Sequence, residues 1–169
     1  ILNKGTFERK EQLMAGPNGE QLRIMTELQE IWGVGKKKAQ ALFNLGLRSI
    51  EDVRERVQLD REKTSQKKSL LTDGQLIGLN RHEDLQERIP RQEVEMITSI
   101  VRAAVNKVAG HAHILVETCG SYRRGNASSG DVDVLISDPT PSGTKFDLCN
   151  VLSMLRENGF LTDDLSHPG

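Results

Sequence analysis

The chain has 169 residues, of which 28% are charged and 36% hydrophobic, and its net charge is −1. No run reaches the roughly 18 apolar residues of a membrane span and no signal peptide is visible, so membrane insertion is not expected. The two cysteines form neither a zinc-binding spacing nor a disulfide framework, which predicts a reducing compartment.

The charge is divided unevenly along the chain. Residues 1–110 hold 19 lysines and arginines against 16 aspartates and glutamates, a net of +3. Residues 111–169 hold 4 against 8, a net of −4. A basic part can follow phosphates and an acidic part can hold metal ions, so this small asymmetry agrees with a nucleic-acid partner.

The first part of the chain is expected to be helical. Apolar residues at helical spacing predict a helix over residues 20–31. Gly33-Val34-Gly35 then allows a tight turn, and a second, lysine-rich helix follows. This pattern is typical of a helix-hairpin-helix, whose free backbone amides and lysines bind a DNA phosphate without reading sequence. The residues predicted to contact DNA are Gly33, Val34, Gly35, Lys36, Lys37 and Lys38.

Three further features of this part carry expectations. Trp32, the only tryptophan, is expected in the core between the hairpin helices rather than stacked on a base. Ser49 is expected to cap another short helix. Residues 58–73 are polar and lack periodicity, which predicts a surface loop.

A long amphipathic helix is predicted after Pro90, which fits a first helical turn. Its apolar stripe contains Val94, Ile97, Val101, Val105 and Val108. A short strand over residues 114–116 follows, and residues 146–157 predict a last helix that stops before Gly159.

The residues from Gly120 to Asp133 carry the chemistry. The alternating run Asp131 to Ile136 predicts a strand, which would place Asp131 and Asp133 on one face. Two carboxylates about 4 Å apart repel by about 1 kcal/mol in water and about 4 kcal/mol at an effective dielectric of 20. A divalent cation turns this repulsion into ligation, and oxygen ligands suit Mg²⁺.

The residues just before the two aspartates predict an anion site. Ser121 is expected to cap a short helix whose free N–H groups attract a phosphate. Arg124, three residues later, would present its guanidinium on the same side of that helix. Gly130 lets a ligand approach the backbone beside Asp131. An anion site next to two carboxylates points to nucleotidyl transfer.

The motif Gly120-Ser121-Tyr122-Arg123-Arg124-Gly125, followed by Gly130-Asp131-Val132-Asp133-Val134, resembles the palm signature of family X DNA polymerases. Tyr122 and residues 160–165 look most similar to one member of that family. The resemblance implies an α+β fold, with an all-helical helix-hairpin-helix subdomain followed by an incomplete nucleotidyltransferase palm. A surface loop leading into an edge strand is the alternative interpretation of the motif.

The resemblance also implies roles for individual residues. Asp131 and Asp133 would be catalytic and would hold two Mg²⁺ ions. Backbone carbonyls of Gln29, Ile31 and Val34 would hold a monovalent cation, Na⁺ or K⁺, at the hairpin. The implied nucleotide-binding residues are Arg88, Gly120, Ser121, Arg124 and Gly130.

The domains implied are the tail of a lyase domain over residues 1–15, a helical DNA-binding subdomain over 16–90 and the first part of the palm over 91–169. Lys4 and Lys10 are not expected to be lyase nucleophiles. Since Ile1 is not a natural start residue, the chain is expected to begin inside a longer protein. A third metal carboxylate and a closing subdomain are expected after Gly169, so the chain by itself is expected to be inactive.

The function implied is that of a DNA-directed DNA polymerase in repair and gap filling, acting as a nuclear monomer. It would transfer a deoxynucleoside monophosphate from its triphosphate to a primer 3′-hydroxyl on gapped or primer-template DNA. Two alternatives stay open: a non-catalytic DNA-binding module built on the hairpin, and an untemplated nucleotidyltransferase.

Overall fold

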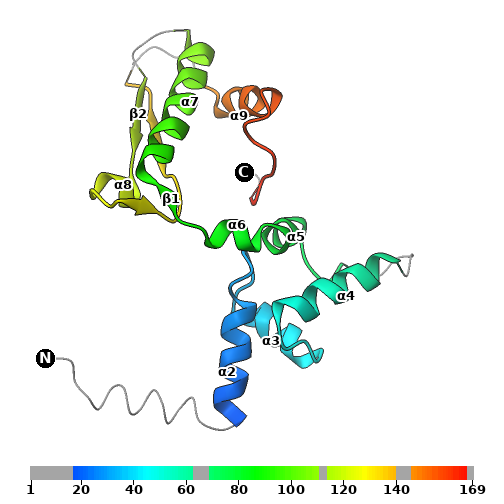
Figure 1. Ribbon diagram of the computed structural model, residues 1–169. Coiled ribbons are helices and arrows are strands. Elements are labelled where there is room, and N and C mark those ends of the chain that lie inside the picture. Colours follow the sequence, from blue (N-terminus) through cyan, green and yellow to red (C-terminus); the bar gives the residue numbers. More distant parts are fainter. Residues whose placement is uncertain (1–16, 63–68, 111–113, 140–145, 167–169) are drawn as a thin grey trace, which may run out of the picture. The chain divides into compact units, whose positions relative to one another are not determined.

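The computed structural model describes residues 17–62, 69–110, 114–139 and 146–166 (Figure 1). The expected lyase-domain tail, with Lys4 and Lys10, lies outside these ranges. The chain divides into two compact units, one formed by residues 1–82 with 164–169 and the other by residues 83–163. The division therefore falls after His82, earlier than the boundary expected after residue 90.

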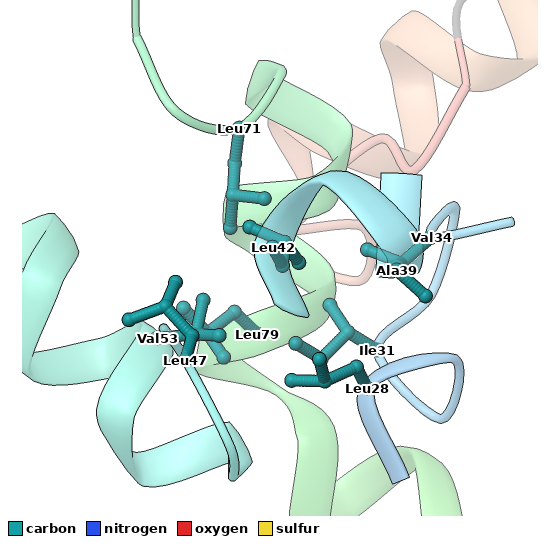
Figure 2. Close-up of a cluster of buried hydrophobic side chains, with 9 residues drawn as sticks. All are labelled: Leu28, Ile31, Val34, Ala39, Leu42, Leu47, Val53, Leu71 and Leu79. Carbon is teal, nitrogen blue, oxygen red and sulfur yellow. The ribbon is translucent and has the colours of Figure 1, made fainter. Parts of the chain in front are cut away.

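The first unit is helical and is built around one aliphatic core. Its helices are α2 (Pro17–Leu28), α3 (Lys36–Asn44), α4 (Ile50–Glu62) and α5 (Asp73–Asn80). Helix α6 (His82–Gln86) begins at His82, where the chain passes into the second unit. Figure 2 shows the core side chains converging from all of the first four helices and their connections. The fully buried members include Leu28, Ile31, Leu42, Val53 and Leu79.

A closed turn joins α2 to α3, as the helix-hairpin-helix pattern predicts. The Val34 N–H donates to the Ile31 carbonyl at 3.0 Å. Gly33 occupies the third turn position with φ +78°, a left-handed conformation that favours glycine. Because Ile31 and Val34 are both buried, the turn is held by the core on either side of the exposed Gly33.

Trp32 is not a core residue, and that prediction is wrong. Its side chain is 39% exposed and lies against α5. A Cβ added at Gly78 would lie 2.7 Å from Trp32 Cβ, and one added at Gly74 would lie 3.3 Å from the ring atom Cζ3. These two glycines, one helical turn apart, let α5 approach Trp32 closely.

The loop expected over residues 58–73 is shorter than predicted. Residues 58–62 belong to α4, and α5 begins at Asp73 behind the capping residue Thr72. Residues 63–68 lie outside the described ranges. Ile50, Val53 and Val57 of α4 pack on the core. Arg56 pairs with Asp60 across one turn, at 3.2 Å, which helps the last turns of α4 to stay helical.

The start of α4 carries the cap that Ser49 predicts. The Asp52 N–H donates to Ser49 Oγ at 3.1 Å, and Asp52 Oδ2 accepts the N–H groups of Arg48 at 2.7 Å and Ser49 at 3.2 Å. This reciprocal arrangement is a capping box. The bond from the Arg48 N–H is the main cause that holds the pKa of Asp52 below its ordinary value of 3.8.

The second unit has an α+β fold, as expected. Its further elements are β1 (Ile89–Pro90), α7 (Arg91–Ala109), β2 (Leu115–Thr118), α8 (Gly120–Arg123), β3 (Ser128–Ser129), β4 (Val134–Ser137) and α9 (Leu148–Glu157). Within the described residues, the strands form two antiparallel pairs, β1 with β3 and β2 with β4. Ile89 lies opposite Ser129 in the first pair, and Thr118 lies opposite Val134 in the second.

The core of this unit lies where α7 and α9 meet the β2–β4 pair. Val105, Val116, Val151 and Leu155 are buried there, and Val101 and Val108 of the predicted α7 stripe pack against them. A hydroxyl pair adds a polar link, because Oγ1 of the buried Thr98 lies 2.8 Å from Thr118 Oγ1 at the end of β2.

The expected strand over residues 131–136 begins later than predicted. Strand β4 starts at Val134, and Asp131 and Asp133 lie in the segment before it. The reason is the partner strand: β2 ends at Thr118 and the chain turns into α8 at Gly120. Among the described residues, therefore, no strand pairs with Asp131. The exposure still alternates as in a strand, because Asp131 and Asp133 are exposed and Val132 between them is half-buried.

Arg91, the first residue of α7, holds the segment from Tyr122, near the end of α8, to Ala127. Its Nη1 donates to the Tyr122 carbonyl at 2.9 Å, and its backbone N–H donates to the Ala127 carbonyl at 3.1 Å. The guanidinium lies 3.8 Å from the centre of the Tyr122 ring, and the Tyr122 hydroxyl donates to Glu95 Oε1 at 3.0 Å. The start of α7 thus fixes both ends of the segment 122–127.

The lowered pKa of Asp52 predicts a pH-dependent contribution to the stability of the first unit. The ionised carboxylate is favoured in the folded state, so its stabilising effect is complete above pH 3.8 and is lost as the pH falls through the lower folded pKa. In urea denaturation followed by Trp32 fluorescence, Asp52→Asn should lower the midpoint near neutral pH, and this difference should shrink below pH 3.8. Glu55→Gln, an exposed change on the same helix, should show no such trend.

The Arg91 contacts predict graded effects at Tyr122. Tyr122→Phe removes the bond to Glu95 and keeps the ring under Arg91, whereas Tyr122→Leu removes both. A hydrogen bond and an exposed cation–π contact each contribute about 1 kcal/mol. Amide hydrogen exchange over residues 120–130 should therefore speed up by about fivefold for Phe and more for Leu. Equal exchange in all three proteins would show that these contacts do not hold the segment.

Candidate functional site

The two aspartates lie beside the start of α8. The Cys119 N–H donates to the Asp133 carbonyl at 2.8 Å, which places Gly120 against the Asp133 side chain. A Cβ at Gly120 would collide with Asp133 Oδ2, and Gly120 has φ +58°. Only glycine fits both the backbone conformation and the space. Gly120, predicted for its backbone, thus has a second role, because it lets the carboxylate approach the α8 backbone.

Arg88 lies at the same end of the unit. Its Nη2 donates to the Ser128 carbonyl at 2.6 Å and its Nε to Ser128 Oγ at 3.3 Å. A Cβ at Gly130 would lie 3.3 Å from Arg88 Nη1. Gly130, the residue before Asp131, therefore leaves room for the guanidinium. The β1–β3 pairing therefore brings together Arg88 and Gly130, which were selected separately from the sequence.

Ser128 is a residue that sequence reasoning missed. It orients Arg88 through its carbonyl and its hydroxyl. The two residues are 40 positions apart, and their contact depends on the pairing of two-residue strands. Strands this short leave no periodic signal in a sequence, so only the tertiary structure reveals the contact.

Ser121 is placed differently from the prediction. The residue before α8 is Cys119, which makes no side-chain cap, and Ser121 lies inside the helix, so the prediction of Ser121 as the cap is wrong. Gly120 takes the first helical position because its left-handed φ turns the chain there. Arg124 directly follows α8 and is exposed.

Asp131 and Asp133 offer exposed carboxylate oxygens, the donor type that Mg²⁺ prefers. Within the described ranges, no group of three or more His, Cys, Asp or Glu side chains is placed to hold a metal ion. The two aspartates therefore fit part of a magnesium site.

The α2–α3 hairpin presents a bare helix start. Gly35 precedes α3 in an extended conformation and has no side chain to cap it, and the first turn contains no acidic residue. Lys36 and Lys37 are exposed. Lys38 differs from them, because its Nζ donates to the Leu70 carbonyl. Of the three predicted lysines, Lys36 and Lys37 are therefore the exposed ones, and Lys38 is bonded to the chain.

The three carbonyls expected to hold a monovalent cation lie in and before this turn. The Ile31 carbonyl already accepts the Val34 N–H at 3.0 Å, and a carbonyl oxygen has a second lone pair for another contact. Gln29 lies just after α2 and Val34 just before Gly35.

In the part of the chain that the structure describes, none of the helices combines the length and the apolar character required to cross a membrane.

Comparison with known proteins separates the chain into two matched regions. Residues 26–86 match the fingers domain of DNA polymerase lambda, and residues 88–169 match the DNA polymerase beta palm. DNA polymerase lambda from Rattus norvegicus is 37% identical over 98% of this chain, and DNA polymerase lambda from Arabidopsis thaliana is 32% identical over 86%. The DNA-directed DNA/RNA polymerase mu of Homo sapiens is 29% identical over 95%.

The chain spans only about a quarter of the length of these relatives, 26%, 25% and 29% respectively. A crystal structure of Leishmania infantum polymerase beta in a ternary P/T complex superposes with a TM-score of 0.74 and 25% identity, covering 88% of this chain and 55% of that one. The similarity to lambda agrees with the resemblance carried by Tyr122 and residues 160–165. The palm motif, the helical subdomain before it and these matches together show that the chain belongs to family X of the DNA polymerases.

Proposed function

We propose that this chain is the DNA-gripping subdomain and the first part of the catalytic palm of a DNA-directed DNA polymerase. One observation carries the proposal: the β1–β3 pairing and the Cys119–Asp133 bond gather Arg88, Gly120, Gly130 and Asp133 at one end of the second unit. Arg88, which contacts Gly130, would bind phosphates, and Asp131 and Asp133, which follow Gly130 in the chain, would bind a metal; phosphoryl transfer requires this combination of groups.

Each of these residues has a task in the proposed reaction, the transfer of a deoxynucleoside monophosphate to a primer 3′-hydroxyl with release of pyrophosphate. Arg88, oriented by Ser128, would neutralise charge on the triphosphate, assisted by Ser121 and Arg124. Asp131 and Asp133 would hold two magnesium ions together with a ligand from elsewhere in the parent protein. When bound, magnesium would lower the charge of the phosphates and activate the hydroxyl.

The hairpin would supply the grip on gapped or primer-template DNA. The uncapped amides at the start of α3 and the exposed Lys36 and Lys37 suit a backbone phosphate in any sequence. Carbonyls of Gln29, Ile31 and Val34 would hold Na⁺ or K⁺ between the hairpin and the DNA. We further propose that the parent protein acts as a monomer in nuclear DNA repair.

A DNA-binding module without catalysis is the competing function, and one observation favours it. The hairpin unit has its own aliphatic core, whereas the described residues of the second unit contain only part of a metal site. An untemplated nucleotidyltransferase has less support, because a small acceptor would not need the DNA-binding hairpin.

Nucleotide binding distinguishes the two functions. The chain should bind a deoxynucleoside triphosphate in isothermal titration calorimetry when Mg²⁺ is present, and more weakly by at least about tenfold in EDTA, because the carboxylates and the triphosphate repel each other without metal. Asp131→Asn with Asp133→Asn should abolish the dependence on magnesium.

Glu117→Gln is the matched control, since it removes one exposed carboxylate of β2 from the same unit. Binding that is unaffected by EDTA, or unaffected by the two aspartate changes, would contradict the polymerase proposal and leave the DNA-binding module.

The salt dependence of DNA binding tests the hairpin. Each lost phosphate contact should reduce the slope of log K against log salt concentration by about 0.9 on duplex DNA. Lys36→Gln with Lys37→Gln should therefore reduce the slope by up to about 2, measured by fluorescence anisotropy on gapped DNA. Lys107→Gln, an exposed change at the end of α7, should leave the slope unchanged; an equal effect there would indicate non-specific attraction.

A further inference from the structure

The Gln75 side chain joins two structures that the sequence does not connect. Its Nε2 donates to the Gly33 carbonyl at 2.7 Å, across 42 residues. Its Oε1 accepts the Thr72 N–H at 3.1 Å, and its backbone N–H donates to Thr72 Oγ1 at 3.3 Å, so the same amide completes the capping box of α5. One side chain thus uses its acceptor for the helix and its donor for the hairpin.

The bond to Gly33 falls on a peptide unit that is already held at its other end. The carbonyl of Gly33 and the N–H of Val34 belong to the same planar peptide group. The first accepts from Gln75 and the second donates to the Ile31 carbonyl at 3.0 Å. Bonds on both edges fix the rotation of this plane.

The hairpin needs an external restraint at this point. Gly33 and Gly35 lie on either side of Val34, and glycine has a wide choice of backbone angles. The orientation of the peptide plane between Gly33 and Val34 affects the direction of the next peptide unit, which consists of the Val34 carbonyl and the Gly35 N–H. Those are the groups that lead into the uncapped start of α3.

The close approach of α5 brings Gln75 within reach. A Cβ at Gly78 would lie 2.7 Å from Trp32 Cβ and 3.1 Å from the Trp32 carbonyl oxygen, so a larger residue would move α5 away from the turn. A Cβ at Gly33 would lie 3.2 Å from Gln75 Cγ, which shows that the stem of Gln75 also packs on the turn. The glycines on both surfaces therefore keep the Gln75–Gly33 bond short.

We propose that Gln75 is a positioning residue for DNA binding, which holds the Gly33–Val34 peptide in the orientation that presents the hairpin backbone to a DNA phosphate. The proposal rests on the function proposed for the hairpin. Gln75 itself touches no DNA in this role, and its effect passes through Gly33.

A matched pair of variants separates positioning from helix capping. Gln75→Met keeps the length and packing of the stem but removes both bonds, and Thr72→Val removes the capping hydroxyl but leaves the bond to Gly33. Both should lower the melting temperature of the 169-residue chain. Only Gln75→Met should raise the Kd for gapped duplex DNA, by about fivefold, as the loss of one hydrogen bond predicts.

A second pair covers the case in which Gln75→Met does not fold. Gln75→Glu retains an acceptor for the Thr72 N–H but has no donor for Gly33, whereas Thr72→Asp retains a good cap and adds the same charge next to it. The Kd of Gln75→Glu should exceed that of Thr72→Asp by about fivefold, from the loss of the same bond. Faster amide exchange at Val34 and Gly35 in Gln75→Glu, and not in Thr72→Asp, should accompany the loss.

The outcomes distinguish this inference from the function on which it rests. If the DNA affinity of each Gln75 variant equals that of its Thr72 partner, the positioning role is wrong while the hairpin function stands. If Lys36→Gln with Lys37→Gln leaves the DNA affinity and its salt dependence unchanged, the hairpin function is wrong and the positioning role is overturned with it.

Discussion

The candidate site depends on the antiparallel pairing of two very short strands. Ile89 and Pro90 lie opposite Ser129 and Ser128, and this pairing brings Arg88 against Gly130, the residue before Asp131. Backbone pairing alone would be weak over two residues, so other contacts support it. Arg91 binds the carbonyls of Tyr122 and Ala127 and stacks on the Tyr122 ring, which ties the end of β1 to the segment before β3.

Glycine has a positional role in both units, because it lets polar groups come closer than a side chain would allow. Gly120 admits the Asp133 carboxylate and Gly130 admits the Arg88 guanidinium. In the first unit, Gly74 and Gly78 admit Trp32, and the approach of α5 puts the Gln75 amide on the hairpin turn. Glycine thus shapes the candidate site in one unit and supports the hairpin turn in the other.

Periodicity and motif spacing predicted most of the elements, while errors occurred where neighbours decide the outcome. The apolar stripe of α7 and the hairpin are as expected, since each follows from a local pattern and packs on the core of its own unit. Trp32 packs against two distant glycines of α5 and is still 39% exposed, which its local sequence does not show. Strand β4 starts at Val134 rather than Asp131 because its partner β2 has already ended.

The sequence by itself determined the family, the α+β class and the pair of aspartates, because the motif from Gly120 to Val134 that indicates them is nearly contiguous. It also determined that Gly33 and Gly35 flank a turn before a basic helix. Only the tertiary structure decided which side chains orient Arg88 and the Gly33 peptide. The Ser128 bond to Arg88 and the Gln75 bond to Gly33 join residues about forty positions apart, and such contacts arise from packing that no local pattern records.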